Sequence, residues 1–152
     1  MTEGSAQSAS RARREAVVRE HWDAENRHDP DGVVASFSVT RASYDIPAFG
    51  PDGQRPNAAS VRVLWEDMLA AFPDFHIDPG PMLHGDNHIF VEVRVTGTQE
   101  GEFAGIPPTG RSVDLPRVAN LFEFDGDELV CERVYIDFAE MMRQLTPVEE
   151  TS

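Results

Sequence analysis

Residues 97–145 decide the fold; they read GTQEGEFAGIPPTGRSV, then DLPRVANLFEFDGDEL, then VCERVYIDFAEMMRQL. A loop rich in Gly and Pro leads into an apolar run, and Asp125-Gly126 separates this run from a second one. Asp-Gly between two apolar runs is a strong signal for a tight β-hairpin, because such turns need residues that tolerate positive φ. The stretch therefore predicts two long antiparallel strands, followed by a short helix that begins after Asp137.

Strand alternation sorts the side chains of the hairpin between two faces. In the second strand one face carries Leu129, Cys131, Arg133, Tyr135 and Asp137, and the other carries Val130, Glu132, Val134 and Ile136. On the first strand Asn120 shares its parity with two phenylalanines, Phe122 and Phe124. We therefore expect Asn120 to face inward, and we place Arg133 and Tyr135 beside Asp137 at the end of the second strand.

The rest of the chain adds helices before a run of strands. Ser10 is a candidate cap for a helix to about Arg27, with an apolar stripe anchored by Trp22. The further expected elements are a short helix at 33–37, a strand at 39–46, a loop at 47–57, a helix from Asn57 or Ser60 to Phe72, and strands at 75–78, 82–84 and 88–99. This order predicts an α+β domain with its helices on one face of a curved sheet.

Length and charge limit the classes of partner. With 152 residues the chain suits one domain, expected over residues 11–146, with a disordered tail at 1–10 and a C-terminal tail at 147–152. The formal charge of −14 argues against a nucleic-acid partner, since phosphate binding needs clustered Lys and Arg. No apolar run approaches the roughly 20 residues of a membrane span. The single cysteine, Cys131, excludes an internal disulfide and suits a reducing cytoplasm.

Several of these motifs together resemble the SnoaL-like polyketide cyclase family of the NTF2-like superfamily. They are Gly97-Thr98, the loop GEFAGIPPTG at 101–110, Asp125-Gly126, Asp137 and Gln144-Leu145, with a weaker match at Phe72-Pro73-Asp74. The resemblance implies a cone in which a curved antiparallel sheet wraps around N-terminal helices and leaves a pocket at its wide end. It also implies a homodimer that pairs sheet to sheet, which would cover Val130, Val134 and Ile136 if they face outward.

Asp137 has two interpretations. With Glu140 three residues later it matches a helix-capping arrangement. The resemblance instead implies that it is the catalytic acid/base, because SnoaL-like cyclases use an aspartate at this position. That chemistry needs a carboxylate in an apolar pocket, where it can take a proton from a carbon next to a carbonyl and later return it. The implied reaction is an intramolecular aldol closure of a small, apolar carbonyl compound or a polyketide, without a cofactor.

Other residues are candidates for binding the substrate. Tyr135, Arg133 and Asn120 can donate hydrogen bonds to a developing oxyanion, and Gln99, His21 and Trp22 are expected to border the pocket. Two positions depart from the family pattern, since Arg133 replaces a frequent tryptophan and Gln99 replaces a frequent histidine. An inward Arg133 would form an ion pair with Asp137 and weaken it as a base.

Two further functions stay open. Epoxide opening, as in the limonene epoxide hydrolase relatives, needs aspartates bridged by an arginine, with tyrosine and asparagine holding water; Asp137, Arg133, Tyr135 and Asn120 supply those residue types. A non-catalytic small-molecule-binding protein on the same scaffold is the other alternative. We expect no metal, because none of the five histidines has the spacing of metal ligands.

Overall fold

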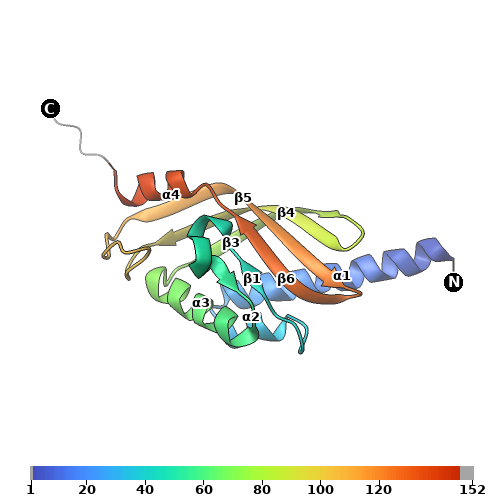
Figure 1. The fold of residues 1–152 in the computed structure, drawn as a ribbon. Helices are drawn as coiled ribbons and strands as arrows, with labels where there is room; N and C mark the ends of the chain where they lie inside the picture. Colours follow the sequence, from blue (N-terminus) through green and yellow to red (C-terminus); the bar gives the residue numbers. More distant parts are fainter. Residues whose placement is uncertain (1, 148–152) are drawn as a thin grey trace.

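The computed structural model describes residues 2–147 and has helices packed on one face of a curved sheet (Figure 1). In chain order the elements are α1 (Glu3–Asn26), α2 (Pro30–Ala35), β1 (Tyr44–Asp45), the 3-10 helix η1 (Pro47–Gly53), β2 (Gln54–Arg55), α3 (Ala58–Ala71), β3 (His76–His84), β4 (His88–Thr98), β5 (Ser112–Asp125), β6 (Glu128–Tyr135) and α4 (Phe138–Leu145). Within these residues there is no helix with the length and apolar character needed to cross a bilayer.

The sheet has six strands in the order β2-β1-β6-β5-β4-β3. Neighbouring strands run antiparallel except β1 and β6, which pair in parallel. The sheet is therefore mixed rather than wholly antiparallel as predicted, while the curved sheet around the N-terminal helices is confirmed. Helices α1, α2 and α3 lie on one side of this sheet, and α4 lies against β5 near one end (Figure 1).

The β5–β6 hairpin turns at Asp125-Gly126 as predicted, with Gly126 at φ 59°. A β-bulge follows, because Glu123 pairs with Cys131 while Phe124 pairs with Leu129, which leaves one extra residue, Val130, on β6. A bulge reverses the parity of the residues beyond it. The predicted inner and outer faces of β6 are therefore exchanged after this point: Val134 and Ile136 point inward, and Arg133 and Tyr135 lie on the outer face.

The core agrees closely with the apolar pattern of the sequence. Seven apolar residues of the helices and strands are at most 4% exposed: Trp22, Val61, Leu64, Phe72, Val91, Val93 and Phe122. Met68 is partly buried against this core. Helix α3 begins after Asn57, one of the two expected starts, with a capping box in which Asn57 accepts from the Ser60 backbone and Ser60 accepts from the Asn57 backbone.

Two segments differ from the sequence prediction. Helix α1 begins at Glu3, so residues 3–10 continue the helix instead of forming a disordered tail; the Ser10 hydroxyl donates to Asp127 at 2.5 Å rather than capping the helix. The strand expected at 39–46 is reduced to β1, and η1 replaces part of the expected loop. Proline at the start of each turn fixes φ for helical geometry, and Gly50 at φ 61° kinks the segment. Of the predicted C-terminal tail, residues 148–152 lie outside the described residues.

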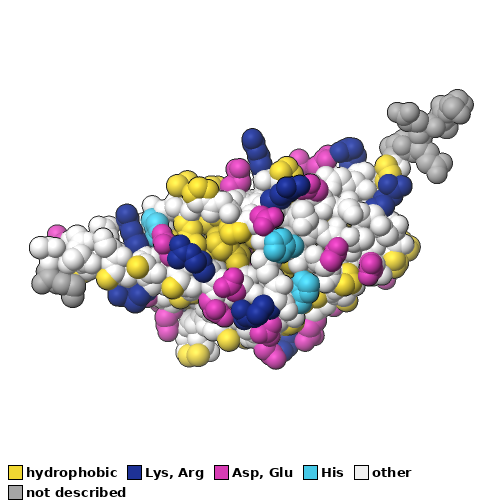
Figure 2. Space-filling view, turned by 180° about the vertical axis from the view of Figure 1, so that it is seen from behind, with side chains coloured by type: hydrophobic (Ala, Val, Ile, Leu, Met, Phe, Trp, Pro, Cys, Tyr) yellow, Lys and Arg dark blue, Asp and Glu magenta, His cyan; other side chains and the backbone are white. Residues whose placement is uncertain are grey.

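The face of the sheet opposite the helices exposes a row of apolar side chains. Leu83 pairs with Phe90, and Phe90 pairs with Leu121 on the next strand. Leu83 and Phe90 are 60% and 37% exposed, and Tyr135 on the same face is 48% exposed. Seen from behind, the molecule shows apolar side chains among acidic and basic ones (Figure 2).

Candidate active site

A cavity of about 70 Å³ lies between the inner face of the sheet and helix α3. Its walls are almost entirely apolar: Ile46, Phe49, Leu64, Met68, Phe75, Ile77, Val95, Leu115, Val118, Val134, Ile136 and Met141. Three residues with polar atoms complete the lining, namely Tyr44, Trp65 and Asn120. An apolar cavity with a few converging polar groups is the usual form of a small-molecule site.

A larger groove of about 660 Å³ lies outside this cavity. Phe49, Leu64 and Met68 line both spaces, so these side chains form the partition between them. Phe49 is held by edge-to-face contacts with Phe103 at 5.6 Å and Phe138 at 5.8 Å. Phe49 and the flexible Met68 therefore lie between the groove and the cavity.

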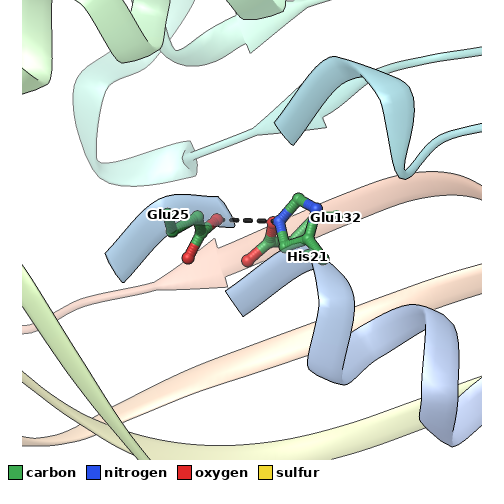
Figure 3. Close-up of side chains that lie close together, drawn as sticks. All are labelled: His21, Glu25 and Glu132. Atoms are coloured by element: carbon green, nitrogen blue, oxygen red, sulfur yellow. Dashed lines mark hydrogen bonds and ion pairs between the residues drawn. The ribbon is translucent and has the colours of Figure 1, made fainter. Parts of the chain in front are cut away.

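A cluster of three ionisable side chains, His21, Glu25 and Glu132, is fully buried behind the cavity (Figure 3). His21 and Glu25 come from adjacent turns of α1, and Glu132 comes from β6. Nε2 of His21 lies 2.7 Å from Oε1 of Glu25 and also contacts Oε2 of Glu132. We call these three residues the acid cluster.

The proton on Nδ1 of His21 is fixed by a neighbouring hydroxyl. Ser36 donates its hydroxyl proton to the Val33 carbonyl at 2.6 Å, so its oxygen accepts from Nδ1 of His21 at 2.7 Å. Burial alone would lower the pKa of His21, but the charges of Glu132 and Glu25 outweigh it and raise this pKa to about 10. The imidazole is therefore charged at neutral pH and donates from both nitrogens.

Glu25 holds the proton that is most easily exchanged. Burial and the charge of Glu132 raise the pKa of Glu25 to about 7, although His21 lowers it. With His21 charged and both glutamates ionised, the acid cluster would carry one uncompensated negative charge in the core. A proton on Glu25 removes that charge, which places an acid/base group with a pKa near neutrality beside the cavity.

Asn120 and Tyr44 join the cavity to the acid cluster. Both line the cavity, and Nδ2 of Asn120 donates to Oε1 of Glu132 at 3.1 Å. Burial, followed by the charges of Glu132 and Glu25 and a hydrogen bond to Glu132, raises the pKa of the Tyr44 hydroxyl well above its usual value. Tyr44 therefore stays protonated and can act as a hydrogen-bond donor.

The acid cluster also has the ligand types of a metal site, since one atom from each residue lies within 4.8 Å of the others. Its spacing fits a shared proton better. Nε2 of His21 lies 2.7 Å from Oε1 of Glu25, an ion-pair distance that is too short for two ligands of one cation. Ligand atoms about 2.1 Å from a tetrahedral cation are roughly 3.4 Å apart.

The structure places Asp137 at the surface, as the N-cap of α4. Its side chain is exposed and accepts a hydrogen bond from the Glu140 backbone at 3.0 Å. It does not line the cavity. Arg133 lies on the outer face, 2.8 Å from Glu123, and Tyr135 is exposed on that face too. The predicted grouping of Asp137, Arg133 and Tyr135 in an apolar pocket is not formed, and the acid/base role of Asp137 stays a prediction.

The remaining predicted residues have other positions. Asn120 faces inward as expected. His21 belongs to the acid cluster, and Trp22 packs on Phe122 in the core at 5.6 Å. Gln99 is fully buried but holds the 100–110 loop instead of the cavity: its amide donates to the carbonyls of Gly101, Ile106 and Pro107 and accepts from Thr109.

Sequence reasoning missed Glu25 and Glu132 as site residues. A signal for both was available, because each is a carboxylate on a face that is otherwise apolar. Glu25 follows Val18, His21 and Trp22 along the buried stripe of α1, and Glu132 alternates with Val134. Fully buried glutamates are rare unless they are paired.

Comparison with known proteins identifies the fold and the family. A putative hydroxylase, AclR from Streptomyces galilaeus, has 23% identity and a TM-score of 0.74, with coverage of 93% of this chain and 85% of that one. A putative SnoaL-like polyketide cyclase from Jannaschia sp. CCS1 has 18% identity, a TM-score of 0.78 and coverage of 91% and 94%. The epoxide hydrolase/cyclase-like enzyme SalBIII, of pyran ring formation in salinomycin, has 19% identity, a TM-score of 0.69 and coverage of 86% and 95%.

At these identities the solved structures show a shared fold and no particular reaction. A search of curated protein sequences gives no match. The family model described as SnoaL-like polyketide cyclase matches residues 15–145, a range that contains the cavity, the groove and the acid cluster. The chain belongs to the SnoaL-like polyketide cyclase family.

Proposed function

We propose that this protein is an acid/base enzyme that closes a ring within a small, mostly apolar carbonyl compound without a cofactor. The observation that carries the proposal is the connection of the apolar cavity to the acid cluster through Tyr44 and Asn120. Fully buried groups with shifted pKa values beside a cavity are typical of active sites.

The proposed reaction is an intramolecular aldol closure of an enolised 1,3-dicarbonyl. The enol carbon attacks a second carbonyl carbon of the same molecule, and a carbon–carbon bond forms. Tyr44 gives its hydroxyl proton to the oxygen of the attacked carbonyl, and Glu25 returns a proton to Tyr44. The enol oxygen loses its proton to Glu25, which restores the acid cluster. No atom is gained or lost overall, so the product is an isomer of the substrate.

The cavity wall contributes by shape and by excluding water. A flexible substrate must fold so that its reacting carbons meet, and fixing that geometry can supply several kcal/mol of the barrier. Apolar walls from α3 and the inner face of the sheet make up most of the cavity, and Tyr44 and Asn120 complete its lining. Donors in such a dry site stabilise a developing oxyanion far better than donors in water.

The geometry supports the acid cluster over Asp137 as the source of protons. Glu25 and Glu132 are fully buried, whereas Asp137 is exposed and outside the cavity lining. Epoxide opening by the limonene epoxide hydrolase arrangement gains no support from geometry, because Arg133 contacts Glu123 and approaches Asp45 on the outer face.

A second candidate is a binding protein without catalysis, and the size of the cavity favours it. At about 70 Å³ the cavity is smaller than the roughly 150 Å³ that accepts benzene in an engineered protein. Turnover of a larger molecule therefore requires Phe49 and Met68 to move. A ligand that binds and is recovered unchanged would favour this candidate.

The test uses nonane-2,4,8-trione, an enolisable diketone with a third carbonyl placed to close a six-membered ring. We expect its conversion to 2-acetyl-3-hydroxy-3-methylcyclohexanone, followed by NMR, with a turnover that falls as pH rises through about 7, where Glu25 loses its proton. A melting temperature raised by the trione identifies binding separately from turnover. Binding with no product above the background would reject catalysis of this reaction.

A further inference from the structure

We infer that Met68 determines which ligands reach the cavity, and that it admits linear, unbranched ketones whose chain continues into the outer groove. Among residues 2–147, Met68 alone lines the cavity, the outer groove and a third space of about 20 Å³. The inference rests on the proposed function, because it names the substrate class of the same cavity.

The third space extends the cavity. Both are lined by Met68, Phe75, Val95, Leu115 and Met141. The two methionines of this set come from α3 and α4, and methionine has an unbranched side chain with three rotatable bonds. A change of rotamer at these two side chains therefore enlarges the cavity without a movement of the backbone.

Three residues separate the cavity from the groove, and Met68 is the one that is free to move. Phe49 is held by its edge-to-face contacts with Phe103 and Phe138. Leu64 is 4% exposed and belongs to the core. Met68, one helical turn after Leu64, is only partly buried. Its rotation opens a path from the groove to the cavity while the aromatic contacts of Phe49 stay in place.

The width of this path determines the ligand class. An opening made by one unbranched side chain passes a linear chain, whereas a ring is stopped by Phe49. In the groove Phe103, Phe138 and three alanines give the chain an apolar surface. The groove also has three carboxylates against one arginine, so a neutral chain fits it better than a carboxylate. A linear ketone thus binds with its carbonyl end in the cavity and its chain in the groove.

The experiment compares the affinities of three neutral ketones: pentan-2-one, nonan-2-one and cyclononanone, a ring with as many carbons as nonan-2-one. Burial of one methylene group is worth about fourfold in affinity. We expect nonan-2-one to bind at least about tenfold more tightly than pentan-2-one, because its four additional methylene groups lie in the groove. Cyclononanone should bind at least about tenfold more weakly than nonan-2-one.

NMR of the protein with ¹³C-labelled methionine and alanine methyl groups locates the ligand. Nonan-2-one should give nuclear Overhauser contacts both to Met141, which lines the cavity, and to Ala104, which lines the groove, and it should shift the Met68 signal. Met142 and Met82 are internal controls, since Met142 packs against the core outside the three spaces and Met82 lines a different groove. Contacts to Ala104 without Met141 would overturn the inference.

Two variants with opposite expected results assign the effect to Met68. Met68→Ile has a similar size, but branching at Cβ leaves one preferred χ1 rotamer in a helix, so the preference for nonan-2-one over pentan-2-one should disappear. Met68→Ala leaves the path open and should keep this preference. Met142→Ile is the matched control and should also keep it, and the methyl spectrum of each variant reports whether the fold is kept.

Three results would overturn the inference. They are equal affinities of pentan-2-one and nonan-2-one in the unsubstituted protein, an unchanged preference for nonan-2-one in Met68→Ile, and no binding of any of the ketones.

Failure of this inference and failure of the proposed function give different results. Binding of nonan-2-one across both spaces without turnover of the trione supports the inference and rejects the enzyme. Turnover of the trione that is equal in Met68→Ile and in the unsubstituted protein, with no preference for the longer ketone, does the reverse.

Discussion

Asn120 donates a hydrogen bond from Nδ2 to Oε1 of Glu132 at 3.1 Å, and this contact joins an apolar cavity to a buried acid cluster. When both glutamates are ionised, the acid cluster carries one uncompensated negative charge in the core, and a bound proton removes that charge. Stability, ligand binding and turnover should therefore all depend on the same group of residues.

Stability should fall as pH rises from about 7.5 to 9. An unfolded histidine titrates near 6.5 and folded His21 near 10, so across this range the folded protein holds a proton that the unfolded chain has released. Each such proton lowers the free energy of unfolding by about 1.4 kcal/mol for every unit by which the pH rises. Glu25, raised from 4.5 to about 7, adds a fall in the same direction between those values.

The measurement is a set of urea unfolding curves at several pH values. Glu25→Gln removes one charge that holds the proton on His21, so its slope above pH 7.5 should be shallower. Glu15→Gln is the matched control, because Glu15 pairs with His84 at 2.8 Å away from the cluster, and it should keep the original slope. Identical slopes for all three proteins would show that His21 and Glu25 do not share a proton.

Gln99→Leu should destabilise the 100–110 loop. Gln99 donates to three backbone carbonyls of this loop and accepts from Thr109, and the change leaves these groups without their partner. We expect a loss of about 2 kcal/mol or more in unfolding free energy, since each unpaired buried group costs about 1–3 kcal/mol. Gln99→Glu keeps the acceptor and loses the donors, so it should be at least as damaging. A change below about 0.5 kcal/mol in both would contradict the role.

Phe49→Ala should admit larger ligands. Phe49 separates the outer groove from the cavity, and its removal joins the two spaces. Ring-shaped ketones that leave the melting temperature of the unsubstituted protein unchanged should raise that of Phe49→Ala. Phe90→Ala on the outer face is the control and should bind the same ligands as before. An unchanged size limit in Phe49→Ala would place the access route elsewhere.

The homodimer stays a prediction, and its basis changes. Val134 and Ile136 line the cavity, so they cannot be the outer face that needs a cover. Leu83, Phe90 and Leu121 form the exposed row instead. Phe90→Glu should dissociate the dimer with little effect on the core. Light scattering of the unsubstituted protein at micromolar concentration that gives a particle of 16.9 kDa would reject the prediction.

The sequence predicted the fold well and the site poorly, for a physical reason. The hairpin turn, the start of α3 and the apolar stripes depend on local pattern, and each is found where it was expected. The orientation of β6 depends on one extra residue, Val130, whose bulge exchanges the faces of Arg133 and Val134. The alternation of side chains in the sequence does not reveal a bulge. Arg133 and Tyr135 were therefore predicted to face inward beside Asp137, whereas they lie on the outer face.

The acid cluster needed long-range information. Glu25 and Glu132 are 107 positions apart, and only packing of α1 against β6 brings Glu132 to His21 and Glu25. An acidic residue in an apolar stripe is a usable signal when it occurs twice, because two buried carboxylates must share a cation or a proton. Asn120 was found because its strand keeps regular alternation from Val118 to Phe124.

The most direct test of the account compares turnover of nonane-2,4,8-trione by Tyr44→Phe and by Asp137→Asn, with the melting temperature of each. Phenylalanine keeps the ring of Tyr44 and removes only its hydroxyl, and asparagine caps a helix about as well as aspartate. We expect Tyr44→Phe to lose at least about a hundredfold in turnover and Asp137→Asn to stay within about threefold, with both proteins folded. A hundredfold loss in Asp137→Asn with an active Tyr44→Phe would contradict this expectation and return the chemistry to Asp137.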